Sequence, residues 1–147
     1  MSDFRYVGTV NGAEPTERDF AVAAGGTATI AIGDVVVIAN GYAAKVADGG
    51  ANAAGFYGLA ISASDETATA DGTVRVQFVV GDALIVRGAP TTADNLAAAI
   101  LFDRVSMDVD GNGVQTVDED DPGAACALLI WDYNATDDTI DVALLNF

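Results

Sequence analysis

The 147-residue chain contains no histidine and a single cysteine, Cys126. Without histidine, the chain lacks the commonest general base, every Ser-His or Cys-His pair and every imidazole metal ligand. A lone thiol cannot form an internal disulfide, and Cys126 lies in an apolar run, so we expect a small core residue rather than a nucleophile. Because no paired-carboxylate signature is present either, the sequence predicts a protein that is not an enzyme and has no catalytic residues.

Positive charge is also scarce. Only 6 Lys and Arg residues accompany 22 Asp and Glu, which gives a formal net charge of -16. Such a field repels nucleic acid phosphates and anionic membrane surfaces, so we expect neither as a partner. Two interpretations of the acidity remain open: attraction of cations or of a basic partner surface, and adaptation to a salty medium.

Long hydrophobic runs are missing as well. No apolar run approaches the roughly 18 residues that a membrane-spanning helix needs. The N-terminus lacks the basic and then apolar pattern of a secretory signal. We therefore expect a chain that stays soluble where it is made, with enough apolar residues (51%) for one substantial core.

What the sequence does contain is the periodicity of β-strands. Apolar and polar residues alternate in residues 27–32, 73–80, 103–109 and 139–144. Continuous apolar runs, which are compatible with burial on both faces, occupy residues 35–39, 83–86 and 127–131. Asn40-Gly41 follows the first of these runs and predicts a two-residue hairpin, because both central positions of a type I′ turn need a positive φ.

Only residues 92–100 favour a helix, which is short and alanine-rich. Many short strands with one short helix predict a mainly β fold, either a small β-barrel or a sandwich. We expect a single β domain over residues 27–147. Residues 1–26 have a lower apolar density and are expected to form an extended N-terminal arm or an edge strand.

One segment has the spacing of a calcium loop. Residues 108–119 fit the pattern D-x-[DN]-x-[DN]-G-x5-E, in which oxygen ligands surround a sharp glycine turn. The ligands would be Asp108, Asp110, Asn112, the Val114 carbonyl and Glu119. The alternative is a β-hairpin with a solvated acidic tip, since residues 103–107 alternate like a strand and Pro122 prevents a following helix. Ca²⁺ in this loop is the one cofactor that the sequence leaves open, and none is required.

Two segments, residues 30–37 and 78–85, share the order apolar run, Gly-Asp, apolar run. They are either an internal repeat or two β-corners at which glycine permits a sharp bend. The order of features resembles the small β-barrel capsid cement, or head decoration, proteins of tailed bacteriophages. The segments that carry this resemblance are residues 33–62, 81–86, 102–105 and 127–130. The acidic segment 108–121 departs from the family's pattern.

The resemblance implies a structural decoration protein, made in the host cytoplasm and placed on the exterior of the capsid in the virion. It would bind the outer surface of the phage head and stabilise contacts between subunits of the major capsid protein, and a homotrimer is implied. An arm formed by residues 2–20 could add a strand to a neighbour's sheet edge. Phe4, Tyr6 and Val7 would then be the partner-binding residues.

A second hypothesis is a calcium-dependent surface adhesion or carbohydrate-binding β module. The acidic loop would supply its ion site, and Trp131 and Tyr133 could line a sugar site. The scarcity of aromatic residues, 7% of the chain, disfavours this second function.

Overall fold

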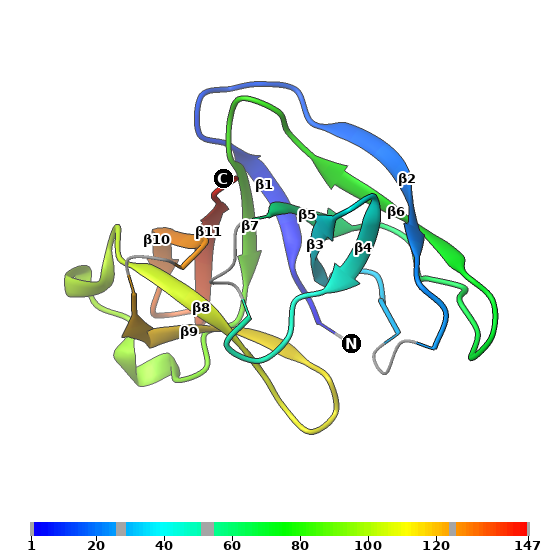
Figure 1. Ribbon diagram of the computed structural model, residues 1–147. Coiled ribbons are helices and arrows are strands. Elements are labelled where there is room, and N and C mark those ends of the chain that lie inside the picture. The colour runs from blue at the N-terminus through cyan, green and yellow to red at the C-terminus, as the bar shows by residue number, and fades with distance from the viewer. Residues whose placement is uncertain (1, 26–28, 51–54, 124–125, 147) are drawn as a thin grey trace.

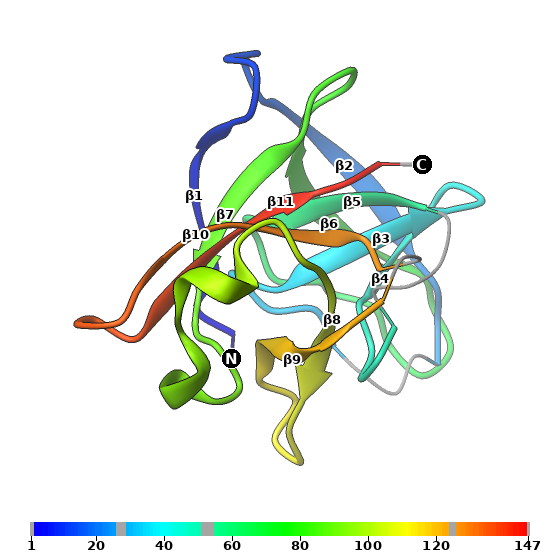
Figure 2. The same ribbon diagram turned by 90° about the vertical axis from the view of Figure 1, so that its left-hand side faces the viewer.

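The computed structural model describes residues 2–25, 29–50, 55–123 and 126–146. Within these ranges the chain is mainly β, as predicted, and its strands form two units. A six-stranded sheet has the order β1-β7-β11-β10-β8-β9, and a closed barrel has the order β2-β4-β3-β5-β6. Figure 1 shows the sheet on the left and the barrel on the right, and Figure 2 looks toward the sheet side. The strands are β1 (Arg5–Thr9), β2 (Thr16–Val22), β3 (Val35–Ala39), β4 (Tyr42–Lys45), β5 (Phe56–Ala60), β6 (Gly72–Phe78), β7 (Leu84–Gly88), β8 (Arg104–Val109), β9 (Gln115–Pro122), β10 (Leu128–Asn134) and β11 (Thr139–Leu144).

The barrel follows from the local sequence around β3. Asn40 and Gly41 have φ angles of 53° and 83°, the two positive values that the predicted hairpin requires, and they join β3 to β4. The continuous apolar run of β3 is also explained. Val36 points into the barrel core, while Val35 belongs to the second core, between the barrel and the sheet. Burial on both faces therefore removes the polar alternation that one-sided strands such as β6 retain.

Gln115, at the start of β9, joins the two units through a buried amide. Its side-chain oxygen accepts a hydrogen bond from Val35 N (2.7 Å), and its nitrogen donates to the carbonyls of Val35 and Val46 (2.9 Å each). The backbone N–H of Gln115 donates to Ser2 Oγ (2.8 Å). Gln115 is 2% exposed, so these bonds satisfy barrel backbone groups that water cannot reach.

The N-terminal residues are built into both units. β1 is an edge strand of the sheet and pairs with β7, whereas β2 pairs with β6 along its whole length and helps to close the barrel. Of the two alternatives for residues 1–26, the edge strand therefore describes β1. Most side chains of these strands remain exposed, which explains the low apolar density of this part of the sequence.

Two local expectations differ from the structure. Residues 92–100 form two single turns of 3-10 helix, Ala93–Asn95 and Ala98–Ile100, instead of one continuous helix. Leu96 interrupts them in an extended conformation and is buried, so tertiary packing overrides the alanine-rich propensity. Thr29–Ile32, the described part of the alternating segment 27–32, forms no strand, and residues 27 and 28 lie outside the described ranges. Among the described residues, no helix has the length and apolar character needed to cross a membrane.

We expect the substitution Gln115→Leu to lower the free energy of unfolding by about 3 kcal/mol, because it leaves the buried N–H of Val35 and the carbonyl of Val46 without their hydrogen-bond partner. Urea denaturation followed by tryptophan fluorescence measures the change. The matched control is Gln77→Leu, since the half-buried Gln77 of β6 makes no side-chain hydrogen bond among the described residues. Equal stability of the two variants would contradict the role of Gln115.

Candidate docking surface

The predicted calcium loop is the hairpin between β8 and β9. The Asp110 carboxylate accepts hydrogen bonds from the backbone N–H groups of Asn112 (2.8 Å) and Val114 (2.9 Å), and these bonds lower its pKa. The Val114 carbonyl accepts a hydrogen bond from Asp110 N (3.0 Å). The loop thus closes on itself as an Asx-type turn, and two of the predicted ligand groups already have protein partners.

Glu119 lies elsewhere. Its buried carboxylate accepts hydrogen bonds from the backbone N–H groups of Thr91 (2.9 Å) and Thr92 (3.0 Å) and from Asn95 Nδ2 (3.1 Å). Glu119 therefore fastens the segment that precedes β8 to β9. In the described part of the chain, no group of three or more His, Cys, Asp or Glu side chains is arranged to hold a metal ion. The structure does not bring the five predicted ligands together.

Asp108 faces Asp48, a neighbour that the spacing of the motif could not reveal. A hydrogen bond between the two carboxyl groups raises the pKa of Asp108 and lowers that of Asp48, whose Oδ1 also accepts from Val109 N (3.0 Å). On β9, burial raises the pKa of Asp118 to about 6, helped by a hydrogen bond that the protonated Asp118 donates to Asp120 and by the charges of nearby carboxylates. The acidic residues of this hairpin are thus crowded against one another.

A second surface feature is an exposed aromatic residue in a strained conformation. Phe102 has a φ of 65° and is 62% exposed, although a positive φ is costly for a bulky side chain. Its ring meets that of Trp131 edge to face, with centroids 5.9 Å apart. The backbone holds it in place, since Phe102 N donates to the carbonyl of Ile130 (2.8 Å) and Ile130 N to that of Asp103 (2.9 Å). Sequence patterns gave no signal for Phe102, because its conformation depends on this pairing with β10.

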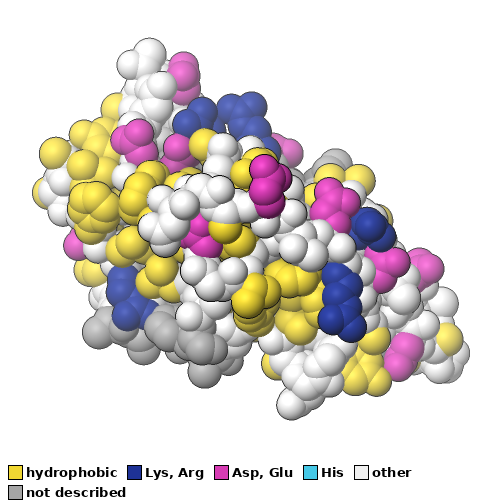
Figure 3. Space-filling view, turned by 90° about the horizontal axis from the view of Figure 1, so that it is seen from above, with side chains coloured by type: hydrophobic (Ala, Val, Ile, Leu, Met, Phe, Trp, Pro, Cys, Tyr) yellow, Lys and Arg dark blue, Asp and Glu magenta, His cyan; other side chains and the backbone are white. Residues whose placement is uncertain are grey.

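Trp131 also borders a shallow apolar hollow of about 370 Å³ at the top of the sheet. The lining comes from the turn after β1, the turn before β7, strand β10 and the C-terminal segment. The residues are Val10, Asn11, Gly81, Asp82, Ala83, Leu129, Trp131, Leu145 and Asn146. Seen from above, hydrophobic side chains gather on the left of Figure 3, on the side of the sheet, and a second group lies over the barrel.

Charged residues of both signs lie near this surface, since Arg104 lines a second hollow together with Phe102 and Asp103. Asp82 belongs to the lining of the apolar hollow, and Asp103 and Asp132 follow Phe102 and Trp131 directly in the chain. The Asp82 carboxylate accepts from the backbone N–H groups of Asn11, Ala13 and Ala83, and these bonds keep its pKa below the usual value. An apolar centre with a charged rim is the general anatomy of a protein-binding surface.

The predicted partner-binding residues separate in the structure. Tyr6 and Val7 are exposed on edge strand β1 (41% and 44%). Phe4 is buried (4%), because its ring packs against Gly88, where any Cβ would overlap it. Phe4 is therefore a core residue and not part of the expected partner-binding strip.

The remaining candidates also divide between core and surface. Tyr133 packs half-buried against the core, whereas Trp131 pairs with Phe102. Cys126 is buried, as expected, and burial raises the pKa of its thiol, which disfavours a nucleophilic thiolate. Comparison with family models, with curated protein sequences and with solved structures gives no match for this chain.

We expect Asp118→Asn to raise the melting temperature at pH 7.5 by a few degrees. The folded carboxyl, with a pKa of about 6 against an ordinary 3.8, binds its proton more tightly than the unfolded one. The stabilisation that Asp118 contributes is therefore fully present below pH 3.8 and is lost as the pH rises through about 6. The amide of the variant does not titrate, so the variant does not lose stability in this pH range.

Thermal unfolding of wild type and variant between pH 4 and 8 measures this effect, with Asp94→Asn as the control because it removes the same charge from an exposed position. A decline in stability from pH 4 to 7 that is equally steep in Asp118→Asn and wild type would show that Asp118 does not titrate in this way.

Proposed function

We propose that this chain is a structural decoration protein that binds the outer surface of a tailed-phage head and stabilises contacts between major capsid subunits. The observation that carries the proposal is the display of Phe102 beside Trp131 and the apolar hollow. A positive φ at an exposed phenylalanine lowers the stability of the fold. Most residues at such an exposed position would be polar. Such local strain is typical of positions that serve binding.

The shape of the surface supports a macromolecular partner. Aromatic anchors close to a shallow apolar depression are the usual centre of a protein–protein interface, and surrounding polar groups exclude water from it. The aspartates of the rim and the net charge of -16 favour a partner surface with basic residues around an apolar side chain. This chemistry suits repeated weak contacts on a shell, where many copies each contribute a modest affinity.

The pairing of β2 with β6 argues against attachment through a free N-terminal arm. A free arm formed by residues 2–20 would need to detach β2, which closes the barrel along seven registered pairs with β6. The proposal therefore places attachment on the preformed face around Phe102 and Trp131, where no rearrangement of the barrel is required. Attachment to a preformed face also avoids the loss of conformational entropy that ordering a free arm would cause.

The test uses expanded, DNA-free heads of the phage that encodes the chain and measures bound copies per head by co-sedimentation. We expect Phe102→Gly to weaken binding at least about tenfold. Its melting temperature should stay within about 3 °C of wild type, because glycine relieves the positive φ while the contact with Trp131 is lost. Trp131→Ala should weaken binding similarly.

The matched control is Ile32→Ala, which removes an apolar side chain of similar exposure (55%) from the turn before β3. Wild-type binding by Phe102→Gly would exclude this face as the attachment site. Absence of wild-type binding to the heads at micromolar concentration would refute the decoration function itself.

A further inference from the structure

Arg5 stands apart from the other five cations of the chain. Arg75 pairs with Glu17 and Asp19, Arg87 with Asp141, and Lys45 with Asp34. Arg104 donates to the carbonyl of Cys126, and Arg18 lies over the ring of Phe20. Within residues 2–25, 29–50, 55–123 and 126–146, the exposed Arg5 has no ion pair, hydrogen bond or ring contact. In a chain with 22 acidic residues, an unpaired guanidinium requires an explanation.

The position of Arg5 in the sheet is also unfavourable. In the register of β1 and β7 it lies directly opposite Arg87, and like charges in directly opposite positions destabilise a sheet. The row continues with Asp141, opposite Arg87 on β11, and then Asp132 on β10. Two cations are therefore followed by two anions across four neighbouring strands. The two anions lie beside Arg87, whereas Arg5, at the sheet edge, makes no ion pair with a described residue.

Arg87 is held in a fixed orientation. Its Nε and Nη2 donate to the two carboxylate oxygens of Asp141 at 2.7 and 2.8 Å, a bidentate pair in which Asp141 is only 8% exposed. Nη1 takes no part in this pair, so donors remain available beside Arg5. A guanidinium fixed in this way loses little further entropy when it binds another acceptor.

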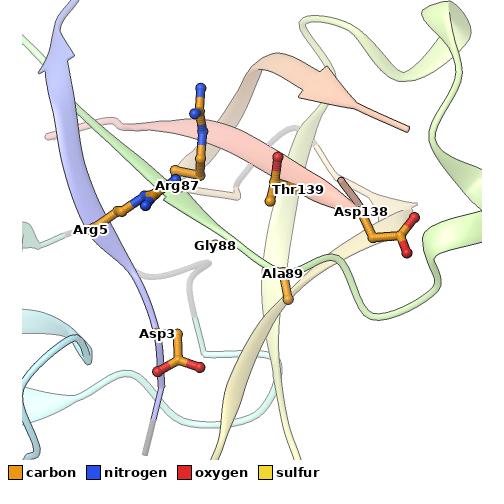
Figure 4. A pocket seen from close by; sticks show the side chains of 7 residues that line it. All are labelled: Asp3, Arg5, Arg87, Gly88, Ala89, Asp138 and Thr139. Atoms are coloured by element: carbon orange, nitrogen blue, oxygen red, sulfur yellow. The ribbon is translucent and has the colours of Figure 1, made fainter. Parts of the chain in front are cut away.

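The two arginines border a hollow of about 270 Å³, lined by Asp3, Arg5, Arg87, Gly88, Ala89, Asp138 and Thr139. Figure 4 shows Arg5 reaching from β1 toward the strand that carries Arg87, with Asp3 and Asp138 on opposite sides of the hollow. The ring of Phe4 occupies the space that a side chain at Gly88 would need, so Gly88 lines the hollow with its backbone alone.

We propose that this hollow binds the carboxylate of an Asp or Glu side chain from a partner protein, clamped between Arg5 and Arg87. The planar fork of a guanidinium matches the two oxygens of a carboxylate. Arg5 and the Nη1 of Arg87 offer donors for the two oxygens of one carboxylate, whereas Asp3 and Asp138 in the lining disfavour a second negative charge such as that of a phosphate dianion. The field of the whole chain disfavours polyanions further.

This site lies on the same sheet as the apolar hollow, and its assignment to the partner's acidic residue rests on the proposed docking function. Ala83 lines the apolar hollow and Arg87 lines this one. Arg87 follows Ala83 by four positions along extended chain, which corresponds to about 13 Å. An extended partner segment would therefore carry its carboxylate about four residues from its apolar anchor.

The test titrates the ¹⁵N-labelled protein with N-acetyl-glutamate N-methylamide and follows the side-chain Nε–Hε signals of Arg5 and Arg87 by NMR. We expect saturable shifts with a Kd on the order of 10 mM. Arg5→Gln should weaken binding at least about fivefold, as one of two charged clamps is removed. The exposed Arg75 of β6, replaced as Arg75→Gln, serves as the matched control.

Each other outcome overturns the proposal. Equal shifts with the neutral N-acetyl-glutamine N-methylamide would exclude carboxylate recognition, and unchanged binding by Arg5→Gln would exclude the clamp. Tighter binding of inorganic phosphate than of the blocked glutamate would assign the hollow to phosphate instead. Because the probe needs no phage head, failure of this experiment is distinguishable from failure of the decoration function.

Discussion

The buried amide of Gln115 is the contact on which the arrangement of the two units most depends. It brings the start of β9, from the sheet, to the backbone of Val35 and Val46 in the barrel, and its own N–H reaches Ser2. Lys45 acts beside it, since its ammonium group contacts both Asp34 and the carbonyl of Gly113 in the β8–β9 hairpin. Apolar contacts between barrel and sheet would tolerate sliding, whereas directional hydrogen bonds in a dry environment specify one alignment.

That alignment supports the surface that we assign to docking. Phe102 keeps its strained conformation because β10 holds the backbone on both sides of it, and β10 is fixed in turn by β11 and β8. Arg87 is held by Asp141 on the neighbouring strand. Binding groups placed on a rigid sheet need little reorganisation when a partner arrives, which would suit the decoration function that we propose.

Sequence patterns predicted the features that depend on short-range chemistry. The hairpin at Asn40-Gly41, the β-rich class and the apolar run of β3 follow from local φ requirements and from period-two burial. The two Gly-Asp segments are turns that lead into β3 and β7: Gly33 and Gly81 have positive φ angles, and each following aspartate accepts from a nearby backbone amide. The hydrogen bonds of Glu119 could not be predicted from local sequence patterns, because its partners lie 24 to 28 residues earlier in the chain. The motif spacing describes a compact loop, but in strand β9 the same residues extend away from the turn.

The order of strands has a mechanical consequence. β1 and β11 both belong to the six-stranded sheet and flank β7, while the whole barrel, β2 to β6, is inserted between β1 and β7 in the chain. A tensile load applied between the first and last strands is therefore borne by the β1-β7 and β7-β11 ladders, pulled against each other in one layer. The barrel lies outside that load path and can keep its shape while the sheet resists the force.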